Sequence, residues 1–241
     1  MMKKTIGILL LALFSSSVLA NEASLRKAIE ASYPKMRIES ITKTNYAGLY
    51  EVFLGGQIVY TDDKFSFLIA EGRLIEPKTK RDITGERMDE LTKVDFATLP
   101  FDQAIKIVKG NGSRKLAVFS DPDCPYCKRL EQNELVNITD VTIYTFLYPL
   151  EQLHPDAKNK SKAIWCAPDR AKAWTDWAMN GRLPEGVASC DTPLDKVADL
   201  GGKLGITSTP TLIFASGKRI LGAHPAKEIE KAMSVVPASK K

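Results

Sequence analysis

The N-terminal part of the chain carries one helical pattern followed by extended ones. Apolar side chains recur every three or four residues over residues 22–33, until Pro34 ends the pattern. From residue 36 to residue 76, short apolar runs alternate with turns rich in Gly and Asp, which is the pattern of a β-meander. We therefore predict an α+β N-terminal domain, a small β-meander with one helix, over residues 21–82.

A helical linker is predicted next, over residues 83–99. Thr84 is a candidate N-cap, a broken apolar stripe continues to Leu99, and Pro100 ends it. A helix holds two domains at a more constant separation than a Gly/Ser tether does. The last apolar strands of the meander leave an edge that has to be covered. We expect the domain to associate through this edge, with packing against the other domain as the alternative.

The remaining residues, 100–241, alternate helical and extended patterns as α/β domains do. A helix near residues 101–109 is followed by a largely apolar strand at 115–120, a helix at 125–135 and a second apolar strand at 141–148. Because the two strands are apolar and are joined through a helix, they favour a parallel βαβ unit.

Helices over residues 156–203, a β-hairpin over 211–221 and a closing helix over 226–236 complete the pattern. The tryptophans of the helical part are expected in the core rather than at a ligand site. The order of βαβ unit, helical insert, hairpin and helix is that of the thioredoxin-like fold. The predicted architecture is thus the α+β domain joined by a helical linker to an α/β thioredoxin-like domain with a helical insert.

Two cysteines separated by two residues stand where the first apolar strand turns into a helix, in the segment Cys124-Pro125-Tyr126-Cys127. Pro125 suits the first helical position, because its φ is fixed near the helical value and it lacks an N–H. Cys124 is thereby placed at the helix N-terminus, where free N–H groups and the helix dipole favour a thiolate. Cys127, one turn further in, is expected to be more buried. This arrangement predicts a dithiol redox site with Cys124 as the nucleophile.

Two other uses of such a pair fit the sequence less well. A zinc site needs a second ligand pair at similar spacing. Cys166 and Cys190 are 24 positions apart, and His154 and His224 do not form a pair. An inert structural disulfide fits poorly with closure across one helical turn. We predict no metal and no cofactor.

The first twenty residues have the pattern of a secretory signal peptide. Lys3 and Lys4 precede a short apolar run, and small residues lead to a cleavage site after Ala20. A retained anchor is the alternative, but the run is shorter than the ~20 residues that span a bilayer. Cleavage leaves 221 residues (241 minus 20) and lowers the net charge from +5 to +3, since two lysines are lost. So small an excess does not predict binding to nucleic acid.

Four cysteines in a chain of this length are too few for a disulfide-built scaffold. In an oxidising compartment they are better interpreted as one functional pair and one structural bridge. If Cys166 and Cys190 are joined, closing the loop between them stabilises the fold by ~3.5 kcal/mol in the chain-entropy model.

A second feature of the thioredoxin-like fold is expected at Thr209-Pro210, just before the hairpin. In thioredoxin-like proteins a proline at this point is cis, and its loop lies against the two cysteines. A cis bond would present the backbone of Thr209 to an extended substrate chain. The alternative is an ordinary proline at the start of a strand.

Longer motifs resemble the periplasmic disulfide isomerase family, DsbC and its relative DsbG. The resemblance extends over essentially all of the mature chain, and it includes the tryptophan-cysteine segment and the later Ser-Cys-Asp, which are more specific than the cysteine pair alone. The shared motifs are Phe119-Ser120-Asp121 before Cys124-Pro125-Tyr126-Cys127, Lys162-Ala163-Ile164-Trp165-Cys166-Ala167, Ala188-Ser189-Cys190-Asp191 and Gly205-Ile206-Thr207-Ser208-Thr209-Pro210.

The resemblance implies a V-shaped periplasmic homodimer formed by the N-terminal domains. It implies an uncharged cleft that holds misfolded secreted proteins with wrong disulfides, chaperone activity, and a membrane reductase of the DsbD type that keeps the cysteines reduced. It also implies a structural Cys166–Cys190 disulfide and a substrate-binding surface. The residues assigned to that surface are Tyr126, Thr209 and Pro210, and those assigned to the dimer strand are Gly56, Gln57, Ile58, Val59 and Tyr60.

One departure from the DsbC pattern leaves the activity open. DsbC proteins often carry Cys-Gly-Tyr-Cys, whereas Pro125 gives this chain the version seen in DsbG, and residues between the cysteines can tune the reduction potential. The alternatives are a DsbG-like reductase that rescues sulfenylated cysteines, a dithiol oxidase, and a chaperone in which the dithiol is secondary. The second cysteine pair favours DsbC. Asp121 and Asp123 oppose a thiolate at Cys124, while Lys128 and Arg129 favour one.

Overall fold

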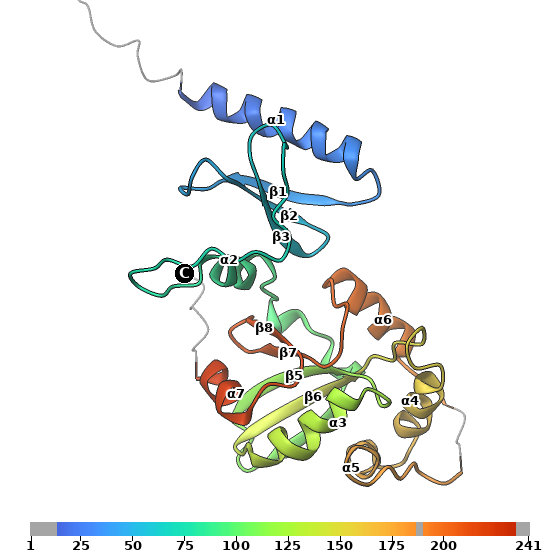
Figure 1. The fold of residues 1–241 in the computed structure, drawn as a ribbon. Helices are drawn as coiled ribbons and strands as arrows, with labels where there is room; N and C mark the ends of the chain where they lie inside the picture. Colours follow the sequence, from blue (N-terminus) through green and yellow to red (C-terminus); the bar gives the residue numbers. More distant parts are fainter. Residues whose placement is uncertain (1–13, 187–189, 235–241) are drawn as a thin grey trace, which may run out of the picture. The chain divides into compact units, whose positions relative to one another are not determined.

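The structure is a computed structural model that describes residues 14–186 and 190–234 (Figure 1). The chain divides into two compact units, Met1–Met88 and Asp89–Lys241. Most of the predicted signal peptide, and residues 187–189 of the helical insert, lie outside the described residues. Each unit is described by itself below.

The N-terminal unit is one helix packed on a small antiparallel sheet, as the pattern predicts. Leu25 and Ile29, one helical turn apart, are both 1% exposed and pack on Tyr50 and Val52 of the sheet. The strand order is β1-β2-β3. The elements are α1 (Phe14–Ser32), β1 (Ile38–Lys43), β2 (Tyr50–Leu54) and β3 (Gln57–Thr61). The helix α1 therefore begins inside the predicted signal peptide.

The last two apolar runs of the predicted meander, residues 65–70 and 73–75, do not form regular strands. Each is reduced to a single bridge, Tyr60 to Ile69 and Ile75 to Asp82. The reason lies in the backbone, because Phe65 and Glu71 have φ of 56° and 59° and so interrupt the extended conformation at both ends of the first segment.

The helix α2 (Ile83–Leu91) is shorter than the predicted linker. Thr84 lies inside it and not at its cap, and the Tyr60 hydroxyl lies 2.6 Å from the Thr84 hydroxyl. The prediction that the helix continues to residue 99 is wrong, because Phe96 and Leu99 are buried in the core of the second unit. The chain reaches that core through two short 3-10 turns, η1 (Phe96–Thr98) and η2 (Phe101–Gln103).

The second unit contains a five-stranded sheet in the order β4-β6-β5-β7-β8. Strands β5 and β6 are parallel, which confirms the βαβ unit. The helix predicted near residues 101–109 is wrong, since β4 pairs antiparallel with β6 there. The physical reason is a period of two, in which Ile105 and Ile107 turn to the core on either side of Lys106. The strands are β4 (Ile105–Lys109), β5 (Arg114–Ser120), β6 (Val141–Leu147), β7 (Thr211–Phe214) and β8 (Arg219–Leu221).

Helices cover both faces of this sheet, and Figure 1 shows α3 running alongside β5 and β6, with α4 and α5 beyond the sheet edge. Alternate residues of β5 supply the two cores: Leu116 and Val118 on the α7 side, Ala117 and Phe119 on the α6 side. The tryptophans are buried, as predicted. The helical elements are α3 (Pro125–Arg129), the π-helical turn η3 (Leu130–Glu134), the 3-10 turn η4 (Leu135–Asn137), α4 (Ala157–Trp165), α5 (Arg170–Asn180), α6 (Leu194–Lys203) and α7 (Ala226–Met233).

Candidate active site

The two cysteines of the central motif lie at the junction of β5 and α3, as free thiols. Cys124 occupies the N-cap position and Pro125 the first helical position, which agrees with the expected role of proline there. Cys124 is 5% exposed and Cys127 is 1% exposed. The first cysteine is therefore the one that a substrate sulfur can approach.

The turn before Cys124 is organised by the carboxylate of Asp121, which is fully buried. One of its oxygens accepts from the backbone N–H of Asp123 at 2.7 Å. The other accepts from the N–H of Leu150 at 2.7 Å and lies 3.0 Å from Nδ1 of His154. A buried acid is tolerated only when it is hydrogen-bonded in this way. Asp121 thus ties the cysteine turn to the loop that follows β6.

The proline loop lies against the cysteines, and its peptide bond between Thr209 and Pro210 is cis, as expected. The thiol of Cys124 is 3.4 Å from the carbonyl oxygen of Thr209. Tyr126, between the two cysteines, is 60% exposed. The three residues predicted to bind substrate are therefore placed around or beside Cys124, a role that stays a prediction.

The pKa of Cys124 is lowered from 9.0 to about 5. The largest cause is a hydrogen bond from the Cys127 thiol to the Cys124 sulfur, and burial acts against it. The Thr209 side chain and the backbone N–H groups of Cys127 and Tyr126 lower the pKa further. Since the thiolate is the reactive form, Cys124 is ionised and nucleophilic at neutral pH.

The pKa of Cys127 is raised instead, first by burial and then by the neighbouring Cys124 thiolate. Its sulfur accepts a hydrogen bond from the backbone N–H of Asp121 at 3.4 Å. The two thiols therefore differ in kind. Cys124 attacks, and Cys127 stays protonated beside it.

We expect the rate at which iodoacetamide alkylates Cys124 in the reduced protein to be half-maximal near pH 5. Because this folded-state pKa lies below the ordinary 9.0, ionisation stabilises the reduced fold. That stabilisation is complete above pH 9.0 and is lost as the pH falls through about 5. Cys127→Ala removes the hydrogen bond that is the largest cause of the lowered Cys124 pKa, so it should move the midpoint to higher pH. A wild-type midpoint near 9 would contradict the assignment.

Charged and aromatic side chains that are distant in sequence complete the site. Lys160 of α4 pairs with Asp123 at 2.7 Å, and Trp177 of α5 donates its indole N–H to the carbonyl of Pro122 at 2.7 Å. Lys128 lies over the Trp177 ring, 4.5 Å from its centre. Sequence reasoning placed Trp177 in the core only and did not identify Lys160, because both approach the turn from helices that no local pattern connects to it.

A disulfide joins Cys166 to Cys190, with the two Cα atoms 5.7 Å apart. It links the end of α4 to the segment that precedes α6. Among the hydrogen bonds of the described residues, none joins Cys166 or Cys190 to the reactive thiols, which contact Asp121 and Thr209 instead. The pair that Cys124 and Cys127 form is therefore separate from this bridge.

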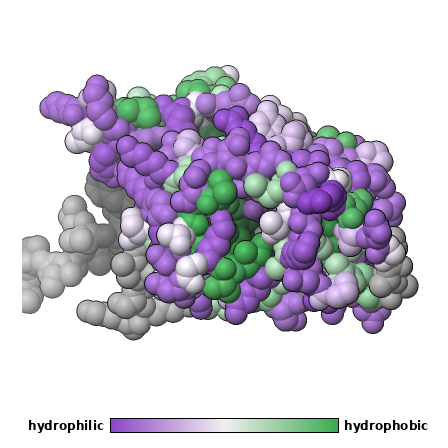
Figure 2. All heavy atoms as spheres, turned by 90° about the horizontal axis from the view of Figure 1, so that it is seen from below, coloured by the Kyte–Doolittle hydropathy of each residue, from purple (hydrophilic) through white to green (hydrophobic). Residues whose placement is uncertain are grey.

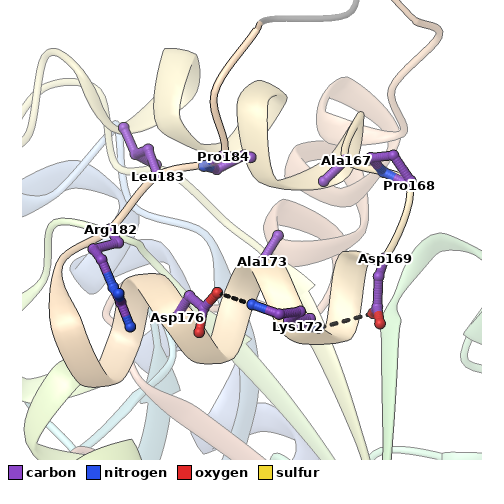
Figure 3. A pocket seen from close by; sticks show the side chains of 9 residues that line it. All are labelled: Ala167, Pro168, Asp169, Lys172, Ala173, Asp176, Arg182, Leu183 and Pro184. Atoms are coloured by element: carbon purple, nitrogen blue, oxygen red, sulfur yellow. Dashed lines mark hydrogen bonds and ion pairs between the residues drawn. The ribbon is translucent and has the colours of Figure 1, made fainter.

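A hollow of about 420 Å³ lies beside α5 (Figure 3). It is lined by residues 167–169 and 182–184 and by Lys172, Ala173 and Asp176 of α5. Lys172 is ion-paired with Asp176 across one helical turn. None of the residues around the reactive thiols lines it, so we do not place the chemistry there.

The residues predicted for the dimer strand lie in or just before β3. Ile58, Val59 and Tyr60 are buried within their own unit, at 5%, 7% and 1% exposure. The outer edge of β3 is covered at Tyr60, which exchanges two backbone hydrogen bonds with Ile69, of 3.1 and 2.8 Å. A second copy would therefore meet the segment that carries Ile69 before it met β3.

The residues that the structure describes form neither a metal-ion cluster nor a membrane-spanning helix. They contain no cluster of three or more His, Cys, Asp or Glu side chains arranged to hold a metal ion. Within the same part of the chain, no helix has both the length and the apolar character that crossing a bilayer requires.

Two protein families match the chain, one for each unit. Residues 16–85 match the disulfide bond isomerase protein N-terminal domain. Residues 101–236 match the thioredoxin-like domain. The boundary between these matches falls in the segment that contains the end of α2.

The chain is 46% identical over 193 residues to the probable thiol:disulfide interchange protein DsbC of Bordetella pertussis, covering 80% of this chain and 67% of that one. It is 31% identical over 228 residues to the thiol:disulfide interchange protein DsbC of Escherichia coli, covering 92% and 91%. A crystal structure of a disulfide interchange protein from Neisseria gonorrhoeae is 50% identical, with a TM-score of 0.54, and covers 56% of this chain and 96% of that chain. The chain therefore belongs to the DsbC family of thiol:disulfide interchange proteins, enzymes of the disulfide isomerase type.

Proposed function

We propose that this enzyme rearranges wrong disulfides in misfolded secreted proteins, with Cys124 as the attacking thiol. The observation that carries the proposal is the position of the Cys124 sulfur, 3.4 Å from the backbone carbonyl of Thr209. An extended client segment that pairs with this backbone would bring its own disulfide to the thiolate. This contact supports substrate binding and attack at the same place.

The reaction balances as two thiol–disulfide exchanges. The Cys124 thiolate attacks one sulfur of a client disulfide, so that the client S–S bond breaks, a mixed disulfide forms and the other client sulfur leaves as a thiolate. In isomerisation a different client thiolate attacks the mixed disulfide and releases Cys124 unchanged. In reduction Cys127 attacks instead, and the client gains two electrons while Cys124 and Cys127 become a disulfide.

The burial of Cys127 favours the first of these outcomes. Its pKa is raised mainly by burial, which persists when Cys124 is bound to a client. A protonated thiol attacks slowly, because the thiolate is the nucleophile. The mixed disulfide therefore lasts long enough for another client thiol to attack it.

The predicted signal peptide supports a location in the periplasm. The basic start, short apolar run and small residues before Ala20 support export and cleavage into the periplasm. An enzyme that acts on wrong disulfides meets its substrates in such an oxidising compartment. The reduced state that attack requires would be maintained by a membrane reductase of the DsbD type.

We further propose that the enzyme is a homodimer, and that copies pair through residues 65–70 rather than through β3. This segment covers the edge of β3 and carries Phe67, Leu68 and Ile69, which are 44%, 36% and 39% exposed. Adjacent exposed apolar side chains on an edge segment favour pairing with another chain. Gly56 and Gln57 would then lie beside the interface instead of forming it.

A chaperone activity is supported by apolar surface on the catalytic unit. Leu153, in the loop that Asp121 holds, is 70% exposed, and Tyr126 is 60% exposed. Figure 2 shows the side of the molecule on which α3 and α5 lie, where apolar side chains gather in a hollow that hydrophilic ones surround. Such surface fits the apolar segments that misfolded clients expose.

The proposal is tested by quenching thiol exchange in cells with acid and then alkylating the unfolded protein in denaturant at neutral pH. We expect Cys124 and Cys127 to be found reduced, because an enzyme that attacks disulfides has to rest as a dithiol. Cys127→Ser should accumulate mixed disulfides with exported proteins. Finding the pair oxidised would indicate a dithiol oxidase instead.

A mass measurement of the native protein gives the assembly state. The mature chain should have the mass of two copies, and Leu68→Lys should shift it to one copy, since the substitution places a charge on the proposed edge. Val136→Lys is the matched control, because Val136 is an exposed apolar residue of the other unit. A single-copy mass for the unsubstituted protein would contradict the dimer.

A further inference from the structure

The carboxylate of Asp123 stands directly before the reactive thiol and is held by a lysine from a different helix. Asp123 precedes Cys124 in the chain, and its two oxygens lie 2.7 and 2.8 Å from Nζ of Lys160. The side chains of the pair are only 17% and 21% exposed, so water screens them less than a surface pair. Without its counter-ion, this carboxylate would oppose a thiolate at Cys124.

Lys160 is located by more than one contact. Trp177 is 9% exposed, and the centre of its ring is 5.3 Å from Nζ of Lys160 and 4.5 Å from that of Lys128. Both ammonium groups are thus within cation–π range of one ring. The same indole donates to the carbonyl of Pro122. One aromatic side chain therefore fixes both the turn and the lysine that neutralises it.

The other charged groups near Lys160 do not take over this role. Asp156, one helical turn earlier, is 3.3 Å from Nζ but is 61% exposed. The oxygens of the buried Asp121 carboxylate are hydrogen-bonded to backbone N–H groups and to His154. Asp123 is consequently the partner whose charge Lys160 offsets, and it is the first cause of the raised pKa of Lys160.

We propose that Lys160 is a positioning residue for thiol exchange, which neutralises Asp123 and, with Trp177, holds the turn before Cys124 so that the attacking sulfur keeps its negative charge. This inference rests on Cys124 being the attacking thiol of the proposed function. In the unsubstituted protein the charges of Asp123 and Lys160 cancel within the pair. Removal of the lysine alone leaves a net negative charge beside the sulfur.

The test is the rate of Cys124 alkylation by iodoacetamide in the reduced full-length mature protein. The rate is measured between about pH 4 and about pH 8, a range that includes the midpoint of about 5. Lys160→Met should lower the rate at pH 5 about threefold and move the whole profile to higher pH. Lys160→Arg should preserve the rate. The matched control is Lys158→Met in the same helix, because Lys158 pairs with Glu151 and Asp195 outside the turn.

A charge-balanced double variant separates this role from a purely structural one. Asp123→Asn alone should leave the rate at pH 5 equal to or above the unsubstituted rate, because a positive group remains. Asp123→Asn combined with Lys160→Met restores zero net charge, and its rate should return to within about 1.5-fold of the unsubstituted protein. A double variant as slow as Lys160→Met, or a Lys160→Met profile equal to that of Lys158→Met, would overturn the inference.

The readout also distinguishes this inference from the proposed function. An unsubstituted protein in which Cys124 is not alkylated at neutral pH would contradict the assignment of the nucleophile itself. Normal alkylation with no difference among the Lys160 variants would reject only the role of Lys160. Because Asp123→Asn alters a partly exposed side chain, it tests the charge argument even if Lys160→Met folds poorly.

Discussion

Replacing Cys124 by serine is expected to reduce the rate of disulfide interchange at least about a thousandfold, to the rate without enzyme. Cys124 combines the lowered pKa, about 5, with the position beside the carbonyl of Thr209. Cys127 cannot replace it, because it is 1% exposed and its pKa is raised by burial. The recovery of active ribonuclease from scrambled disulfides measures the rate.

The matched variant is Cys127→Ser, which keeps the attacking thiolate. We expect it to form mixed disulfides with the scrambled client and to retain part of the isomerisation, while reduction is lost, because only reduction requires the second thiol. Both variants should unfold at similar denaturant concentrations, so that a difference in activity is not a difference in folding. Normal rescue of ribonuclease by Cys124→Ser would reject the mechanism.

Replacing Asp121 by alanine is expected to lower the free energy of unfolding by about 3 kcal/mol, because the partly buried N–H groups of Asp123 and Leu150 lose a buried, charged acceptor. Both hydrogen bonds are 2.7 Å long, and the carboxylate is fully buried. His154 loses a partner at 3.0 Å as well. Urea unfolding of the reduced protein, followed by far-UV circular dichroism, measures the change.

The control for this loss of unfolding free energy is an exposed aspartate whose carboxylate also accepts a hydrogen bond from a nearby backbone N–H. Asp169 accepts from the N–H of Lys172 at the start of α5, and Asp169→Ala should cost about 1 kcal/mol, as for an ordinary N-cap. The loss of unfolding free energy for Asp121→Asn should lie between these two values. Its amide keeps one acceptor oxygen and turns a donor toward the other N–H groups. Equal losses for Asp121→Ala and Asp169→Ala would show that burial does not strengthen the Asp121 bonds.

The proline loop and the cysteine turn were predictable because each has a local signal. Pro125 at the first helical position identifies where α3 begins, and the cis bond at Thr209-Pro210 was expected because a proline stands at that point of the thioredoxin-like order of elements. Both signals depend on proline geometry, which acts within one or two residues. The helix over α1 and the parallel β5–β6 pair followed from hydrophobic periodicity, which is equally local.

Short elements near the edges of the two sheets were not predictable in this way. In β4, Ile105 and Ile107 fit both a short helix and a strand, and pairing with β6 decided for the strand. The apolar segment at 65–70 looks like a strand, yet the positive φ of Phe65 and Glu71 limits it to one bridge with β3. Propensity differences over so few residues are smaller than the energy of tertiary contacts.

The sequence by itself determined the reactive pair and which of its thiols attacks first, because the spacing of the cysteines and Pro125 at the start of α3 are encoded next to one another. The longer motifs indicated the family through resemblance alone. Only the tertiary structure decided what surrounds the two thiols. Lys160 and Trp177 reach the turn from α4 and α5, and Asp121 ties it to His154. Their effect on Cys124 depends on charges and hydrogen bonds at distances of a few ångströms, which folding alone creates.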